Sequence, residues 1–207
     1  MTNKFIFLRY NLEKFEDIHL KKLLLLLPLL SSVLLAEAKI YVGTGYTYNS
    51  ESVSYMKAGT YEHVNKSFQS NGARLKIGYG DIKAYAIELS VDYIDNKKAV
   101  FDKNDAEKVG FNLELLKSFD FDIFVYPFVK AGFGGGYFKT NADIVNKSLT
   151  YGTWNLGTGI FIPYSEHIDF EIAYEYKSLS YQKTDPTLNT SPSSDVNIAY
   201  IGINFRY

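Results

Sequence analysis

Serine, histidine and acidic side chains lie close together in two short polar segments of the chain. Ser165, Glu166 and His167 are consecutive, and Ser67 follows His63 by four positions. These are the residue types of a hydrolytic triad, in which histidine activates a serine hydroxyl and an acid orients the histidine. Acyl transfer requires the three groups to converge on one oxygen in space. The sequence gives no sign of such convergence, so we interpret both segments as surface turn residues and predict no catalytic site.

Charged side chains of both signs recur inside segments that are otherwise apolar or small. The set consists of Arg74, Lys76, Glu88, Asp92, Lys108, Glu114, Lys130, Asp169, Glu171, Glu175 and Arg206. Paired carboxylates can perform acid–base catalysis, and a line of charges can form a gate or a thin ion path. Because the two signs nearly balance, we predict mainly a network of mutually paired side chains, since buried charges persist only when they are paired.

Other chemistries find little support in the sequence. The segment Gly43-Thr44-Gly45 is followed by neither a third glycine nor a helix, so it fails as a dinucleotide-binding fingerprint. The absence of cysteine removes a lipoprotein anchor, a disulfide scaffold and thiolate metal sites. A net charge of −1 gives no indication of nucleic acid as a partner. We therefore predict no cofactor, no metal and no nucleic acid.

An apolar run near the start of the chain has the features of a secretory signal. Lys21 and Lys22 precede the run Leu23–Ala36, which ends at Ala36-Glu37-Ala38. A helix needs about 20 apolar residues to span a bilayer, and this run is too short. A basic flank, a short apolar core and an A-x-A site predict a helical signal peptide over residues 1–38, cleaved after Ala38. The alternative is an uncleaved anchor, and the charged lead of residues 1–20 is unusually long.

Beyond Ala38 the sequence alternates between apolar and polar or small residues with a period of two. Such alternation predicts strands rather than helices. In each segment one face is continuously apolar, while the other is small or charged. The eight segments are 39–49, 73–79, 85–93, 109–115, 122–138, 151–163, 168–176 and 199–207. In the fifth segment this register turns Phe124, Tyr126 and Phe128 inward, unless a bulge near Pro127 lets these aromatics face outward.

Three observations favour a membrane barrel over a soluble sandwich. The segments approach the 9–11 residues that a tilted strand needs to cross a bilayer. The connections alternate between short (80–83, 117–121, 163–167) and long (50–72, 96–108, 139–150, 179–195), as in outer-membrane barrels. Outward aromatic residues gather in two girdles, which we place at residues 79, 85, 164, 205 and 207 and at residues 46, 48, 93, 137, 154, 174 and 176. We therefore predict an all-β, eight-stranded antiparallel up-and-down transmembrane β-barrel over residues 39–207.

The last strand, Ala199–Tyr207, and the segment Tyr126–Gly134 resemble small outer-membrane barrels of the OmpA-like and OmpX-like type, the β-barrel porin family. The chain departs from that family in ending on tyrosine, where phenylalanine is usual. The resemblance implies insertion by the outer-membrane assembly machinery, which reads an aromatic-ended final strand. The matching positions are Ile201, Ile203, Phe205 and Tyr207.

The resemblance implies a location in the outer membrane of a Gram-negative bacterium, reached through the general secretory route. The expected partners are membrane lipid, lipopolysaccharide and the assembly machinery, and the loops have a possible extracellular ligand. The function that we favour is a non-enzymatic barrel that presents surface loops for envelope integrity or adhesion. A narrow pore or small-solute channel is the alternative. A lipid A-modifying enzyme is a third, since some small barrels act on lipid A.

Overall fold

The computed structural model describes residues 38–56, 63–95, 107–139, 148–183 and 191–207. The predicted signal peptide, residues 1–38, lies outside these residues except for Ala38. In the part of the chain that is described, no helix has the length and apolar character needed to span a bilayer. The described residues form strands, as the period-two alternation predicted.

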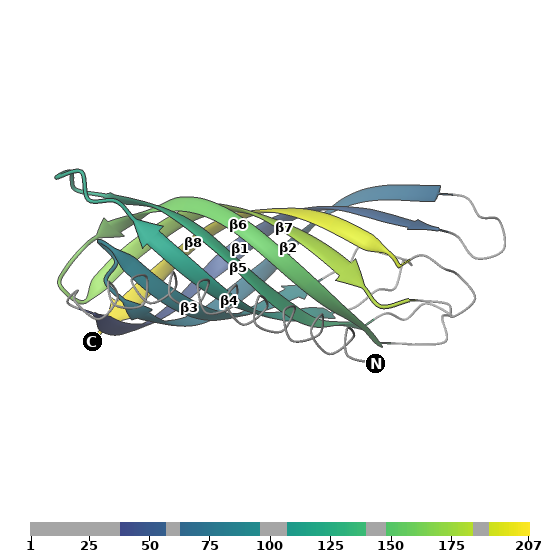
Figure 1. Cartoon of the computed structure of the whole chain (residues 1–207), viewed down its shortest axis with the longest axis horizontal. Coiled ribbons are helices and arrows are strands. Elements are labelled where there is room, and N and C mark those ends of the chain that lie inside the picture. The colour runs from purple at the N-terminus through teal and green to yellow at the C-terminus, as the bar shows by residue number, and fades with distance from the viewer. Residues whose placement is uncertain (1–37, 57–62, 96–106, 140–147, 184–190) are drawn as a thin grey trace, which may run out of the picture.

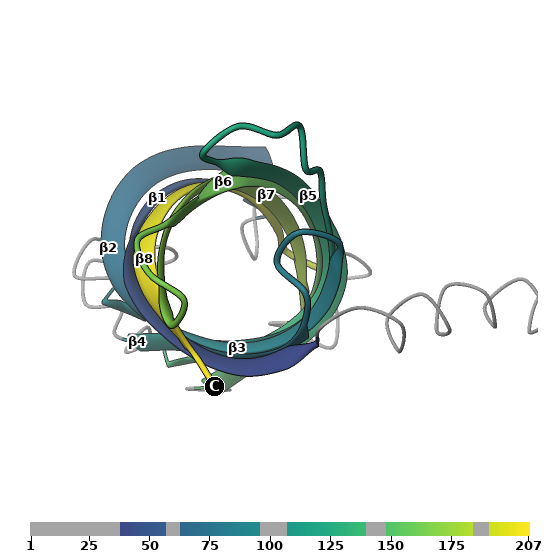
Figure 2. The same cartoon turned by 90° about the vertical axis from the view of Figure 1, so that its left-hand side faces the viewer.

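Eight antiparallel strands close into a single barrel in sequence order (Figures 1 and 2). They are β1 (Lys39–Met56), β2 (His63–Gly80), β3 (Tyr85–Asp95), β4 (Glu107–Ser118), β5 (Tyr126–Lys139), β6 (Ser148–Pro163), β7 (Ile168–Tyr181) and β8 (Ser193–Arg206). Closure comes from β8 pairing with β1, in a register that runs from Arg206 opposite Tyr41 to Ser193 opposite Ser54. The predicted eight-stranded up-and-down barrel is confirmed.

The two ends of the barrel differ, and we call them the terminal end and the distal end. The terminal end holds both barrel termini, because the backbone N–H of Tyr207 donates to the Ile40 carbonyl at 2.9 Å. It also holds the turns after β2, β4 and β6, at residues 81–84, 119–125 and 164–167. The strand ends that the connections 57–62, 96–106, 140–147 and 182–192 join meet at the distal end.

The predicted loop at residues 50–72 is wrong, because β1 and β2 continue through most of it. The two strands pair without interruption from Lys39 opposite Gly80 to Met56 opposite His63. Figure 1 shows this hairpin projecting beyond the other strands at the distal end. Polar residues do not end a strand while its backbone groups stay paired. The inward alternation also persists, as Thr47, Asn49, Glu51 and Val53 are all buried.

The predicted fifth strand also begins too early, and no bulge relieves its register. Pairing of β5 with β6 is continuous from Tyr126 opposite Phe161 onward. Phe128 therefore faces inward, where its ring stacks on Phe161 with centroids 4.6 Å apart. Phe124 belongs to the turn instead of the strand and is 77% exposed. Asp122, two residues before Phe124 in the same turn, has a φ of 57°, which is in the left-handed region.

Two apolar clusters occupy the interior, one toward each end. The terminal-end cluster consists of Tyr41, Ile82, Ala86, Leu116, Phe128, Phe161, Ala173 and Tyr200. The distal-end cluster consists of Val53, Phe138, Leu149, Leu179, Tyr181, Val196 and Ile198. The register of β1 and β2 places Arg74 and Lys76 opposite Gly45 and Gly43, between these clusters. The interior is therefore layered, with a charged middle enclosed by apolar side chains.

Candidate functional site

The charged middle of the barrel is the candidate site, since most of the buried charged side chains of the described residues lie there. Of the eleven residues that the sequence singled out, ten are buried and Arg206 is half-buried. These residues come from six strands, and a further charge described below comes from a seventh. In each strand the charged residues occupy the alternate positions that face inward. Side chains at alternate positions share one face of a strand, so the spacing of the charges carries them all into the lumen.

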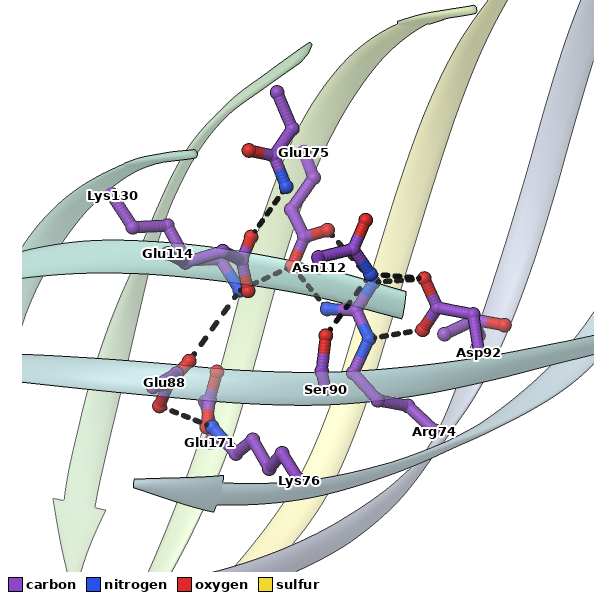
Figure 3. Close-up of polar contacts among 12 residues, drawn as sticks. Arg74, Lys76, Glu88, Ser90, Asp92, Asn112, Glu114, Lys130, Glu171 and Glu175 are labelled. Atoms are coloured by element: carbon purple, nitrogen blue, oxygen red, sulfur yellow. Dashed lines mark hydrogen bonds and ion pairs between the residues drawn. The ribbon is translucent and has the colours of Figure 1, made fainter. Parts of the chain in front are cut away.

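Arg74 lies at the centre of the network (Figure 3). Its Nε donates to Asp92 on β3 at 2.5 Å, and its Nη2 donates to Glu175 on β7 at 2.9 Å. Because β2 and β7 are not neighbours in the barrel, the second contact crosses the lumen. A guanidinium suits this place because its planar fork can engage two carboxylates at once.

Lys130 on β5 also contacts Glu175 and links it to two further carboxylates. Its Nζ lies 2.5 Å from Glu175, 3.4 Å from Glu114 and 4.0 Å from Glu88. The second oxygen of Glu114 accepts a hydrogen bond from Asn155 on β6 at 2.6 Å. One ammonium thus serves three carboxylates that come from three different strands (Figure 3).

Lys76 anchors the layer nearest the terminal-end cluster. Its Nζ donates to Glu88 at 2.8 Å and also pairs with Glu171 on β7. The Tyr41 hydroxyl donates to Glu88 at 2.6 Å, and Asn204 donates to Glu171 at 3.1 Å. Both carboxylates therefore have a neutral donor in addition to the ammonium.

Arg206 and Asp169 form a separate pair at the terminal end. The Arg206 Nη2 donates to Asp169 at 2.7 Å and to the Ser165 carbonyl at 3.2 Å. The latter bond ties β8 to the turn between β6 and β7. Asp169 is fully buried there, while Arg206 is partly exposed.

Sequence reasoning missed two interior charges, Lys177 and Glu51. Lys177 on β7 donates to Asp92 at 2.6 Å and to Asn112 at 3.1 Å. Glu51 on β1 accepts two bonds from Lys108 at 2.7 Å each, so the predicted residue Lys108 pairs with a carboxylate that was assigned to a loop. Continuing the inward parity two positions further along β1 and β7 would have found both.

The candidate triad residues do not form a catalytic arrangement. In the turn after β6, the backbone N–H of His167 donates to Ser165 Oγ at 3.3 Å. Ser67 lies on β2, where its hydroxyl contacts Ser52 Oγ at 3.5 Å. These are contacts of a turn and of a strand pair. Among the described residues, no group of His, Asp and Glu side chains has an arrangement that could hold a metal ion.

One small cavity lies among the charged side chains of the lumen. This cavity of about 20 Å³ lies between the charged layer and the distal-end cluster, and its lining includes Asp92, Lys108, Asn112, Tyr151 and Lys177. That volume accommodates about one water molecule. Chemically, the described part of the interior links opposite walls through ion pairs.

Large apolar side chains face outward from all eight strands of the barrel. Leu75 and Phe111 are each 62% exposed, and Phe133 is 65% exposed. Aromatic side chains lie outward near both ends, among them Tyr79 and Phe205 toward the terminal end and Tyr46 and Tyr174 toward the distal end. Lipid-exposed barrels have this pattern, in which an apolar band is flanked by aromatic girdles.

Comparison with known proteins agrees with this geometry. The family model described as "Outer membrane protein beta-barrel domain" matches residues 22–207. Neisserial surface protein A has a similar structure, with 16% identity and a TM-score of 0.63 over 82% of this chain and 99% of that chain. OprG from Pseudomonas aeruginosa is 17% identical with a TM-score of 0.50, over 83% of this chain and 97% of that chain.

The structure of AlkL in DMPC lipid bilayers is 14% identical with a TM-score of 0.52, over 83% of this chain and 91% of that chain. No curated protein matches the chain. At these identities the structural likenesses establish the fold alone, whereas the family model covers most of the sequence. The chain therefore belongs to the outer membrane protein β-barrel family, and its barrel lies in the outer membrane of a Gram-negative bacterium.

Proposed function

We propose that this chain is a non-enzymatic scaffold that holds its four distal connections at the cell surface, for envelope integrity or adhesion. The observation that carries the proposal is the ion pairing across the lumen. Lys177 on β7 contacts Asp92 on β3, and these strands lie on opposite walls. An eight-stranded barrel is just wide enough for side chains to fill, and here charged and apolar side chains fill it. The surface that remains for interaction is at the ends.

The orientation follows from a general property of such barrels, in which short turns lie in the periplasm and the other connections face outward. The terminal end then faces the periplasm. Lys39, the residue after the predicted cleavage site, is the first residue of β1 and lies at that end. This placement agrees with export through the general secretory route, removal of residues 1–38 and insertion by the outer-membrane assembly machinery.

Conductance separates the scaffold from its alternative, a narrow pore. The mature chain, folded and reconstituted in a planar bilayer, should carry no steady current and at most small flickering events. Each preparation should first show heat-modifiable gel migration, which reports a folded barrel. Large and steady porin-like currents from such a preparation would overturn the proposal.

The role of the distal connections can be tested apart from the barrel. Replacement of residues 57–62 by a glycine–serine linker should reduce binding of cells to host-cell or matrix surfaces while the barrel still assembles. Deletion of the whole gene should in addition increase sensitivity to detergent. If neither adhesion nor detergent sensitivity responds to the deletion, the scaffold has no role in the envelope or at the surface.

Modification of lipid A, the third alternative, has no support in the contacts of Ser165 and His167 described above. Mass spectra of lipid A from the deletion strain should match those from the parent strain. A change in acyl chains that Ser165→Ala reproduces would favour the enzyme instead. Lipopolysaccharide then remains a lipid neighbour of the distal girdle and not a substrate.

A further inference from the structure

The turn between β4 and β5 exposes an unusual amount of apolar surface for a periplasmic connection. Four of its seven residues are large hydrophobics that are exposed: Phe119 at 39%, Phe121 at 63%, Ile123 at 50% and Phe124 at 77%. Contiguous exposed apolar side chains usually mark a contact with a membrane or with another protein.

The turn has a defined conformation. The backbone N–H of Phe119 donates to the Pro127 carbonyl at 2.8 Å, which closes the base of the turn. Within it, the N–H of Asp122 donates to the Asp120 carboxylate at 3.0 Å. The rings of Phe119 and Phe121 are stacked, with centroids 6.1 Å apart. The apolar side chains are thus presented on a fixed backbone.

Its position distinguishes this turn from the one between β2 and β3 at the same end. Ile82 in that turn is only 1% exposed and belongs to the terminal-end cluster, so it covers the lumen. Figure 2 shows the β4–β5 turn outside the ring of strands, beside β5 and β6. A side chain that lies outside the ring of strands contacts the surroundings of the barrel, and in an outer membrane these surroundings are lipid.

The surface around the turn is suited to the lipid headgroup region. Lys117 Nζ lies 4.0 Å from the centroid of the Tyr85 ring and 5.8 Å from that of Phe119. Lys83 Nζ lies 5.3 Å from the Tyr126 ring centroid. Aromatic rings with adjacent ammonium groups are typical of membrane interfaces, where the ring lies at headgroup level and the cation meets phosphate.

We propose that the β4–β5 turn is a membrane anchor, with Phe121, Ile123 and Phe124 inserted among the phospholipids of the inner leaflet. The turn is continuous with the lipid-facing surface of the barrel through Lys117 and Tyr85. The exposed carboxylates of Asp120 and Asp122 remain in the headgroup region, where water and lipid cations solvate them. A periplasmic protein and a second copy of this chain are the competing occupants.

A tryptophan reporter tests the proposal, because Trp154 is the chain's only tryptophan. The full mature chain with Trp154→Phe and Phe124→Trp is folded into dioleoylphosphatidylcholine vesicles, and into vesicles of the same lipid brominated on its acyl chains. Emission should be blue-shifted, lose most of its intensity in the brominated vesicles and resist aqueous iodide. Trp154→Phe with Glu166→Trp, in the β6–β7 turn, is the matched control and should be quenched by iodide.

Two other results would overturn the anchor. A reporter that iodide quenches and bromine does not lies in water, as a site for a periplasmic partner would. A reporter that neither reagent quenches is covered by another copy of the chain. If Phe124→Trp prevents heat-modifiable folding, Phe121→Trp gives the same test from a position that is 63% exposed.

Discussion

Arg74 and Glu175 are 101 positions apart in sequence, yet the Arg74 guanidinium donates to the Glu175 carboxylate at 2.9 Å across the barrel interior. Asp92 completes this contact on the other side of the guanidinium. Since all three side chains are almost fully shielded from water, the cation and both anions depend on one another. Loss of the Arg74 guanidinium should therefore destabilise the barrel.

Arg74→Met should lower the free energy of unfolding by about 3–5 kcal/mol, because it leaves buried carboxylates without a partner. Lys139→Met is the matched control, since Lys139 forms an exposed pair with Glu107 at 3.6 Å and its loss should cost at most about 1 kcal/mol. Urea unfolding of the folded barrel in phospholipid vesicles measures both. Equal losses in the two variants would mean that the central ion pairs do not stabilise the barrel.

Two glycines that lie on different faces of the wall should respond in opposite ways to alanine. A Cβ at Gly132 would lie 2.2 Å from the Leu113 carbonyl oxygen, and a backbone atom cannot yield easily. Gly132→Ala should therefore destabilise the barrel by about 1–3 kcal/mol. A Cβ at Gly152 meets no atom within 4 Å, so Gly152→Ala should stabilise it by about 0.5–1 kcal/mol through reduced chain entropy. The same unfolding assay decides, and a neutral Gly132→Ala would contradict the packing described for the interior.

The orientation of the barrel can be read from single cysteines, since the chain has none of its own. Ser191→Cys at the distal end should react with a membrane-impermeant maleimide on intact cells. Glu166→Cys at the terminal end should react only after the outer membrane is opened. Both positions are exposed in the folded barrel, so the difference reports sidedness alone. The reverse labelling pattern would place the terminal end outside the cell.

The C-terminal strand should be essential for assembly. Removal of Phe205–Tyr207 deletes the backbone pairing that joins Tyr207 to Ile40, and each unsatisfied backbone group in lipid costs several kcal/mol. The truncated chain should still be exported and cleaved but should accumulate in the periplasm or be degraded. Loss of heat-modifiable migration and of fractionation with the outer membrane measures this.

A finer variant separates recognition by the assembly machinery from stability. Tyr207 is 78% exposed and Tyr164 at the same end is 74% exposed, so neither side chain is needed to fill the core. Tyr207→Ala should reduce assembly in cells, whereas Tyr164→Ala should not. Both variants should fold equally well into detergent in vitro. If the two behave alike in cells, the terminal aromatic carries no assembly signal.

Much of the fold could be predicted because a strand's two faces are set by parity. Once Leu75 and Ile77 are outward, Arg74 and Lys76 must be inward, and no tertiary information is needed. The strand number followed from the count of alternating segments, and the barrel was predicted from strand length, the alternating connection lengths and the aromatic girdles. Strand length was harder, as β1 shows, because the mostly polar residues 50–56 were assigned to a loop although the inward parity continues through Glu51 and Val53. The strand ends only where its pairing with β2 ends.

The partners within the network could not be predicted. Lys108 pairs with Glu51, and Lys130 lies among Glu88, Glu114 and Glu175, only because closure brings these strands around one lumen. Parity says that a charge faces inward, but the choice of partner depends on strand tilt and on side-chain reach. The start of the fifth strand was predicted too early for a different reason, since the alternation of Phe124, Tyr126 and Phe128 imitates a strand although β5 begins at Tyr126.

The pairing across the lumen also constrains how the barrel can fold. Asp92 lies opposite Arg74 in the β2–β3 hairpin and can pair with it early, but Glu175 is on β7 and meets Arg74 only when the barrel closes. A partly formed sheet would leave Glu175 without Arg74, and a one-residue slip of a strand would turn its charges outward. Only the fully closed barrel in its correct register satisfies every charge together. The interior network thus makes insertion highly cooperative and selects against misregistered intermediates.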